Sequence, residues 1–227
     1  IVAGITPWNY PLMMAIWKIG PALATGNTVV LKPAPTTPMT AVRLGELAAE
    51  FFPQGVLNVV LGGDEAGKAL VAHDAVDMVS LTGSVEAGKS VARAASDSLK
   101  RVHLELGGKA PVVVFDDVDM ATAMETIAGT GYYNAGQDCT AATRVLAGAK
   151  VYDDVVAGLA EQAKGYVLGD TMRAETTLGP LNSAEQRERV ERFLSSKPAH
   201  AEVVTGGNEP DLPGFYLEPT VVAGLEQ

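Results

Sequence analysis

Short apolar runs of strand length alternate along the chain with segments whose apolar residues recur at helical spacing. The strand-length runs lie at 29–31, 57–61, 78–82, 102–106 and 111–115, and the helical patterns between them lie at 40–51, 67–72 and 85–99. Strands separated by single helices are typical of β-α-β crossovers, which build a mostly parallel sheet. The pattern therefore predicts an α/β fold in which ligands bind beyond the carboxyl ends of the strands.

The pattern changes near the Gly107-Gly108-Lys109 turn. Beyond it we expect a helix at 119–133, a strand around 144–146 and a helix at 152–166, followed by a segment rich in Gly, Pro and charge at 197–219. We therefore predict two domains, at residues 1–108 and 109–227. No internal repeat is visible.

Composition and charge narrow the class of protein. Of the 227 residues, 47% are apolar and 19% charged, which is ordinary for a globular chain, and no run approaches the ~18 apolar residues of a membrane span. A net charge of −10 disfavours nucleic acid as a partner. The three histidines are scattered and adjoin no cysteine, so no metal site is predicted. A single cysteine excludes an internal disulfide framework, and we expect a cytoplasmic protein with no membrane partner.

That single cysteine, Cys139, lies in the loop-like run Asn134-Ala-Gly-Gln-Asp-Cys-Thr-Ala-Ala-Thr143. A lone cysteine is most often a buried, inert thiol. Here small and polar neighbours offer little apolar packing, and Gly136 suits a turn that presents the sulfur to a ligand. We therefore interpret Cys139 as a candidate nucleophile.

Two glycine-containing turns are candidates for contact with phosphate, although no Gly-x-Gly-x-x-Gly fingerprint is present. Gly62-Gly-Asp-Glu-Ala-Gly67 and Thr82-Gly-Ser84 each lie between a predicted strand and a predicted helix. Unpaired N–H groups at a helix N-terminus bind phosphate, but a structural turn or a plain Ser84 N-cap explains the same residues. From pattern alone, both interpretations stay open.

Several motifs in a fixed order together resemble the aldehyde dehydrogenase superfamily. They are Thr6-Pro-Trp-Asn-Tyr-Pro11, Leu31-Lys-Pro33, Leu81-Thr-Gly-Ser84, Glu105-Leu-Gly-Gly-Lys109, Gly136-Gln-Asp-Cys139, Leu178-Gly-Pro-Leu181 and Gly214-Phe-Tyr-Leu-Glu-Pro-Thr220. The 34 positions from Glu105 to Cys139 also match the family. The resemblance implies a Rossmann-like parallel sheet as cofactor domain, followed by part of an α/β catalytic domain. It is nearest to the amino-aldehyde branch, especially γ-aminobutyraldehyde (4-aminobutanal) dehydrogenases, with betaine aldehyde dehydrogenases nearby.

The resemblance assigns three catalytic roles. Cys139 forms a thiohemiacetal with the aldehyde, and the Asn9 side-chain amide donates to its oxyanion. Glu105 then activates the water that hydrolyses the thioester. Each residue has a structural alternative, since Asn9 can shape a turn and Glu105 can be a solvated strand carboxylate. His103, which shares the strand face of Glu105, is an alternative base.

The cofactor implied by the resemblance is NAD, with NADP as the alternative. Lys32 matches a lysine that contacts the adenosine ribose, Trp8 a position lining the cofactor cleft, and Ser84 a pyrophosphate contact; Thr82, Gly83 and Gly67 complete the candidate set. Many relatives carry a glutamate three residues after this lysine, where this chain has Pro35. A proline side chain cannot accept hydrogen bonds from ribose hydroxyls, which weakens the preference for NAD.

Three residues near the cysteine are candidates for substrate contact. Tyr132 and Tyr133 can line the aldehyde tunnel or simply end a helix. A carboxylate at Asp138 disfavours the neighbouring thiolate unless a cation offsets it, and a substrate ammonium supplies that cation; the alternative is a carboxylate pointing into solvent. We expect 4-aminobutanal or a related amino aldehyde, a place in polyamine breakdown, and a homo-oligomer (dimer or tetramer).

Other interpretations remain. A relative that passes the thioester to coenzyme A is disfavoured by Glu105, a non-catalytic scaffold by the intact trio of candidate residues, and a cysteine hydrolase by the lack of a suitably placed histidine. The chain begins at Ile1, ends after a Val-Val run and lacks the family's later Glu-x-Phe-Gly-Pro segment. We therefore expect a piece of a longer protein, unstable or inactive by itself.

Overall fold

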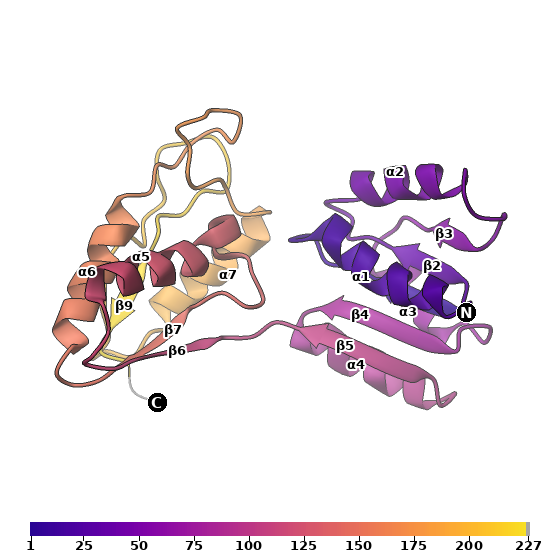
Figure 1. Cartoon of the computed structure of the whole chain (residues 1–227), viewed down its shortest axis with the longest axis horizontal. Coiled ribbons are helices and arrows are strands. Elements are labelled where there is room, and N and C mark those ends of the chain that lie inside the picture. Colours follow the sequence, from indigo (N-terminus) through magenta and orange to yellow (C-terminus); the bar gives the residue numbers. More distant parts are fainter. Residues whose placement is uncertain (226–227) are drawn as a thin grey trace. The chain divides into compact units, whose positions relative to one another are not determined.

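The computed structural model describes residues 1–225, and the chain divides into two compact units, residues 1–107 and 108–227 (Figure 1). The first unit is a five-stranded parallel sheet with helices between its strands. In chain order its elements are β1 (Val2–Ile5), α1 (Pro11–Ala24), β2 (Val29–Lys32), α2 (Met39–Ala48), β3 (Leu57–Val59), α3 (Asp64–Ala72), β4 (Met78–Gly83), α4 (Val85–Ser96) and β5 (Arg101–Leu106).

The sheet order is β3-β2-β1-β4-β5, so the chain builds outward from β1 first on one side and then on the other. Apolar residues face both sides of the sheet. One cluster packs α1 and α2 against β1 and β2, with Ala15, Ile19 and Leu31 at its centre. A second packs α3 and α4 against the other face of β1, β4 and β5. This doubly wound arrangement has its topological switch point between β1 and β4, where ligands of such sheets bind.

The second unit combines a two-stranded parallel pair with helices and a separate antiparallel pair. Its elements are β6 (Pro111–Val114), α5 (Met120–Gly131), the short helix η1 (Tyr133–Gly136), β7 (Arg144–Ala147), α6 (Tyr152–Lys164), α7 (Ala184–Ser195), β8 (Glu202–Thr205) and β9 (Val221–Ala223). Its core joins α5 and α6 to β6 and β7, and Val221 packs against it.

The predicted α/β fold with a mostly parallel sheet is confirmed. The predicted helix at 67–72 begins earlier, at Asp64, because two acidic residues after Gly63 complement the positive end of the helix. Gly67 therefore lies inside α3 rather than in the preceding turn, and a Cβ there would meet only the Lys32 side chain, no closer than 3.7 Å. The positive φ of that turn belongs to Gly62 instead.

Candidate functional site

Most of the candidate cofactor residues lie at one edge of the first unit's sheet, where the parallel strands end. Lys32 ends β2 and Thr82 and Gly83 end β4, while Trp8 and Asn9 follow β1 in the loop that leads to α1. Ser84 directly follows β4, and Glu105 is the penultimate residue of β5. Because the carboxyl ends of parallel strands meet at one edge, the fold gathers residues that are up to 97 positions apart (105 − 8).

Lys32 is only 5% exposed, and its Nζ donates to the Pro33 carbonyl oxygen at 3.1 Å. Burial lowers the pKa of Lys32, while the carboxylate of Asp64 acts in the opposite direction. An ammonium group has three protons, so Lys32 can donate to a ligand as well as to Pro33. Asp64 at the same time makes this corner unfavourable for an additional phosphate group.

The N-terminus of α4 is the better of the two candidate phosphate sites. Ser84 is its N-cap, and the Ser84 Oγ accepts from the Ala87 backbone N–H at 3.1 Å. The remaining N–H groups of a first helical turn have no partner within their own helix, which leaves them to a ligand or water. The N-terminus of α3 instead carries Asp64 and Glu65, whose charges repel an anion. The N-cap and the phosphate contact are compatible roles for Ser84.

A buried charged side chain that the sequence interpretation missed interacts electrostatically with Glu105. Lys18 of α1 is 7% exposed, and its Nζ donates to the Ser80 Oγ at 3.1 Å and to the Thr82 Oγ1 at 2.8 Å. Burial lowers the pKa of Lys18 to about 8, and the Glu105 carboxylate acts in the opposite direction. The sequence signal that could have revealed its burial is helical spacing: Lys18 lies four residues after Met14 and four before Ala22, both of which are buried.

The loop that carries Cys139 contains an unusual backbone turn. Asn134, Ala135 and Gly136 have φ values of 51°, 57° and 72°, so three consecutive residues occupy the left-handed region. Glycine adopts this conformation freely and asparagine tolerates it, but for alanine it costs about 1–2 kcal/mol. Strain of this kind persists where surrounding contacts fix the backbone, and it is concentrated at functional sites.

Side chains of the loop hold this turn in place. Gln137 donates from Nε2 to the Asn134 carbonyl at 3.1 Å, and its Oε1 accepts from the Asn182 backbone N–H at 2.9 Å. Asp138 Oδ1 accepts from both the backbone N–H and the hydroxyl of Thr140, at 2.8 and 2.9 Å. Cys139 is half-buried within this frame. The polar residues around the cysteine therefore order its backbone, as a presented nucleophile requires.

The two candidate tyrosines differ. Tyr132 packs edge-on against Tyr166 with ring centroids 5.2 Å apart, and its hydroxyl donates to the Thr220 carbonyl at 3.0 Å. Burial raises the pKa of Tyr132 to about 12. These contacts make Tyr132 part of the second unit's interior, as the helix-end alternative expects, whereas Tyr133 is 61% exposed.

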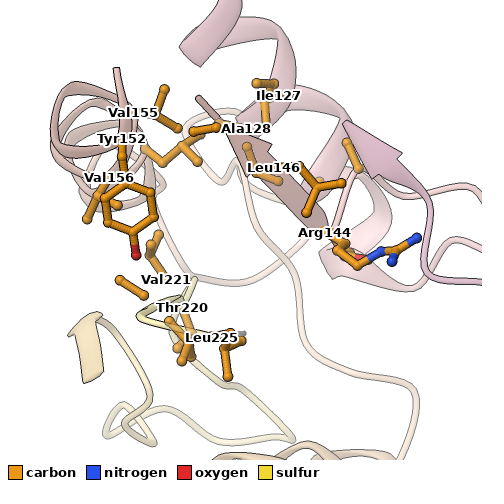
Figure 2. A pocket seen from close by; sticks show the side chains of 18 of the residues that line it. Ile127, Ala128, Arg144, Leu146, Tyr152, Val155, Val156, Thr220, Val221 and Leu225 are labelled. Carbon is orange, nitrogen blue, oxygen red and sulfur yellow. The ribbon is translucent and has the colours of Figure 1, made fainter. Parts of the chain in front are cut away.

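The second unit also has a partly open, mostly apolar pocket of about 620 Å³ (Figure 2). Its walls come from α5, α6, β7 and β9, with Ile127, Leu146, Val155 and Val221 among the lining side chains. Tyr132 is the one candidate site residue among the described lining residues, and neither a carboxylate nor Cys139 is among them. The cavity therefore lacks the groups that aldehyde chemistry requires.

The structure thus brings Asn9, Lys32, Ser84 and Glu105 to one edge of the first unit, while Cys139 and Asp138 share a loop of the second. Within residues 1–225, no three His, Cys, Asp or Glu side chains are grouped to hold a metal ion. None of the helices in that range has the length and apolar character needed to cross a membrane.

Comparison with known proteins covers the whole chain. The model of the Aldehyde dehydrogenase family matches residues 1–227. Phenylacetaldehyde dehydrogenase of Pseudomonas fluorescens is 46% identical over 231 residues, covering 100% of this chain and 46% of that protein. Betaine aldehyde dehydrogenase of Bacillus subtilis is 44% identical, covering 96% of this chain and 46% of that protein.

Solved structures agree with these matches. Betaine aldehyde dehydrogenase from Staphylococcus aureus in complex with NAD+ superposes with a TM-score of 0.96 at 40% identity, covering 99% of this chain and 46% of that one. HpcC from Thermus thermophilus gives a TM-score of 0.95 at 42% identity, with the same coverage of each chain. The chain spans slightly less than half the length of these relatives.

Proposed function

Because the chain belongs to the aldehyde dehydrogenase family, we propose that its full-length gene product oxidises an aldehyde to the carboxylic acid, with NAD as the hydride acceptor. The observation that carries the proposal is the pairing of two features. The candidate cofactor-binding residues gather at the carboxyl ends of the first unit's parallel strands, at the topological switch point. In the second unit, a strained, hydrogen-bonded loop presents Cys139.

Cys139 begins the proposed reaction. Its thiolate attacks the carbonyl carbon, a C–S bond forms, and the carbonyl oxygen becomes an oxyanion. The Asn9 amide and the Cys139 backbone N–H donate to that oxygen, and losing one such donor typically costs about 3–4 kcal/mol of transition-state stabilisation. When bound, the dinucleotide supplies the acceptor that takes the hydride from the substrate carbon and leaves a thioester on Sγ.

Glu105 completes the proposed cycle. Its carboxylate takes a proton from water, the water oxygen attacks the thioester carbon, and the C–S bond breaks to release the acid and restore the thiolate. The half-exposed position of Glu105 supports this role, because the general base must reach solvent water. A base that activates water also favours hydrolysis of the thioester over transfer of its acyl group to coenzyme A.

NAD is the proposed cofactor and NADP the alternative. Lys32, Ser84 and the first turn of α4 would hold the dinucleotide, with Thr82, Gly83 and Trp8 beside it. The negative charge of Asp64 next to Lys32 supports NAD, because a 2′-phosphate in that corner would face a carboxylate. This support for NAD comes from charge alone and does not depend on ribose contacts, which the side chain of Pro35 cannot make. Relatives crystallised with NAD+ lend further support.

The first experiment measures NADH formation by the full-length gene product on a panel of aldehydes. Cys139→Ala should abolish turnover, because it removes the proposed nucleophile. Activity that survives Cys139→Ala, or no oxidation of any aldehyde with NAD or NADP, would overturn the proposal and favour a non-catalytic scaffold. A requirement for coenzyme A would favour the acylating alternative.

For the substrate we propose 4-aminobutanal or a related amino aldehyde, which implies a role in polyamine breakdown. Relatives that act on phenylacetaldehyde and betaine aldehyde are similarly close, so the support comes from Asp138. Its carboxylate is held by Thr140 next to the nucleophile, where a substrate ammonium would balance its charge.

Asp138→Asn keeps an acceptor for Thr140 and removes the charge. We expect it to raise KM for 4-aminobutanal about tenfold, equivalent to about 1.4 kcal/mol, and to leave KM for butanal unchanged. Equal effects on both would remove the support from Asp138.

Two further expectations remain proposals for the full-length product. A homo-oligomer, dimer or tetramer, is expected from the family resemblance, as is a cytoplasmic location. Light scattering on the purified full-length product measures the first directly, and a monomeric mass would contradict it.

A further inference from the structure

A column of polar side chains crosses β4 and β5 on the face of the sheet that α1 covers. Ser80 and Thr82 alternate with buried Val79 and Leu81, which face α3 and α4. The parallel register then places Ser80 beside His103 and Thr82 beside Glu105. Ser80 and Thr82 thus accept from the Lys18 ammonium, and His103 and Glu105 lie beside them on the neighbouring strand. A sheet face that only packs against a helix would carry apolar side chains, so these polar side chains point to a role beyond packing.

The direction of the hydrogen bonds in this column follows from the donor and acceptor capacity of each group. The charged Lys18 ammonium has no acceptor, so the Ser80 Oγ accepts its proton at 3.1 Å. The Ser80 hydroxyl has one proton of its own, and His103 Nδ1, 3.0 Å away, is the acceptor available to it among the described side chains. If Nδ1 donated instead, this buried hydroxyl proton would lack an acceptor, at a cost of about 1–3 kcal/mol, so Ser80 donates to Nδ1. A neutral imidazole that accepts at Nδ1 carries its own proton on Nε2.

That Nε2 atom lies 3.4 Å from Oε1 of Glu105. The polar chain that begins at Lys18 therefore ends 3.4 Å from the carboxylate that we assign as general base, slightly beyond the usual length of an N–H···O hydrogen bond. The same assignment bears on whether His103 is itself the base. With Nδ1 accepting from Ser80 and Nε2 protonated, neutral His103 has no lone pair left to take a proton from water.

We propose that His103 is a positioning residue for Glu105: Lys18 and Ser80 fix its tautomer, and its Nε2–H holds the carboxylate in the orientation that activates water. The inference rests on the proposed function, because it assumes that Glu105 is the base for thioester hydrolysis. It makes no claim on the earlier step, so acylation of Cys139 should not depend on His103.

Two substitutions at one position separate a donor role from a packing role. In His103→Gln the side-chain amide nitrogen reaches the place of Nε2 and retains a donor toward Glu105. In His103→Asn the amide reaches only the place of Nδ1, which retains the contact with Ser80 and loses the donor. Ser80→Ala leaves the ring in place and removes the contact that fixes its tautomer. His73→Asn is the matched control, because His73 Nδ1 accepts a local backbone N–H, that of Ala75.

The readout is the reaction of the full-length gene product with 4-nitrophenyl acetate. The thiolate of Cys139 takes the acetyl group and releases nitrophenolate as a burst; water then hydrolyses the thioester to acetate and sets the steady rate. We expect His103→Asn and Ser80→Ala to slow the steady rate about tenfold with an unchanged burst, since misplacement of a catalytic group by an ångström can cost more than this. His103→Gln should stay within about twofold of the unsubstituted protein, and His73→Asn should not change it.

Glu105→Gln in the same assay separates the inference from the function on which it rests. If Glu105→Gln leaves the steady rate unchanged, the assignment of the base is wrong and the inference falls with it. If Glu105→Gln is slow while His103→Asn matches the unsubstituted protein, the inference alone is overturned. The same holds if Asn and Gln at position 103 are equally slow, or if the burst falls together with the steady rate.

Discussion

Gly107 and Gly108 are neighbours in the sequence, yet a methyl group would have different effects at the two positions. At Gly107 no heavy atom lies within 4 Å of an added Cβ. At Gly108 the added Cβ would lie 3.1 Å from the Cys139 carbonyl oxygen, tighter than ordinary van der Waals contact. The backbone of the candidate nucleophile therefore rests directly on Gly108.

Gly108→Ala should lower kcat for aldehyde oxidation about tenfold, because the methyl group displaces the Cys139 backbone and with it both the thiol and the N–H proposed for the oxyanion. Steady-state kinetics of the full-length product measure this. Gly107→Ala is the control and should change kcat little. If the two variants behave alike, the contact with Cys139 does not govern the reaction.

Sequence alone indicated part of this site. The small and polar neighbours of Cys139 predicted a presented loop, and alternation along 102–106 placed His103 and Glu105 on one strand face, as the structure has them. The buried Lys18 was not predicted, since its burial depends on hydroxyls supplied by β4, more than 60 residues away. A local pattern does not reveal such a partner.

At the scale of elements, α1 and α4 end in the same way with different residues. In each, a residue two or three positions past the end of the helix has positive φ: Gly26 (φ 75°) after α1, and Leu99 (φ 53°) after α4. The N–H of the next residue then donates to a carbonyl five positions earlier in the chain. The paired backbone bonds, such as Leu99 N–H to Ser96 and Lys100 N–H to Ala95, are those of a Schellman motif. Glycine is the usual residue at this position.

Leu99→Gly should therefore stabilise the protein. Leu99 is 91% exposed, so little packing is lost. Relief of the left-handed conformation is worth about 1–2 kcal/mol, and the greater freedom of glycine in the unfolded chain removes about 0.5–1 kcal/mol of it. Gly26→Ala, where an added Cβ meets nothing within 4 Å, should be destabilising by about 1 kcal/mol. Thermal unfolding of the full-length product should shift upward for the first and downward for the second. Shifts in the same direction would contradict the argument.

The elements that the sequence pattern predicted are those with a clear apolar signal. Helices at α4, α5 and α6 were expected within a few residues of where they lie. The prediction did not include α7, because none of its residues is buried and it therefore shows no apolar face. It also omitted α1, whose interior carries Gly20 and Pro21, residues that ordinarily argue against a helix.

At the scale of the whole molecule, the division into two units separates the proposed cofactor contacts from the proposed nucleophile. Every residue proposed to hold the dinucleotide lies within residues 1–107, whereas Cys139 and Asp138 lie beyond residue 108. The cofactor's binding and the covalent chemistry should therefore respond to different sets of substitutions. The sequence pattern of one unit does not reveal this separation of roles. The separation follows from the position of each motif relative to the Gly107–Gly108 boundary.

Lys32→Met should raise the Kd for NAD about 10–100-fold, the equivalent of losing one hydrogen bond from a charged donor, about 1.5–3 kcal/mol. Methionine retains most of the apolar stem, so the packing of the end of β2 is preserved. Lys68→Met is the matched control: Lys68 lies on α3, is paired with Glu65 and is exposed, and its loss should leave Kd unchanged.

Cys139→Ala should likewise bind NAD with an unchanged Kd while losing oxidation. Titration calorimetry on the three variants of the full-length product tests the separation. A weakened Kd in Cys139→Ala would show that the cysteine loop takes part in holding the cofactor.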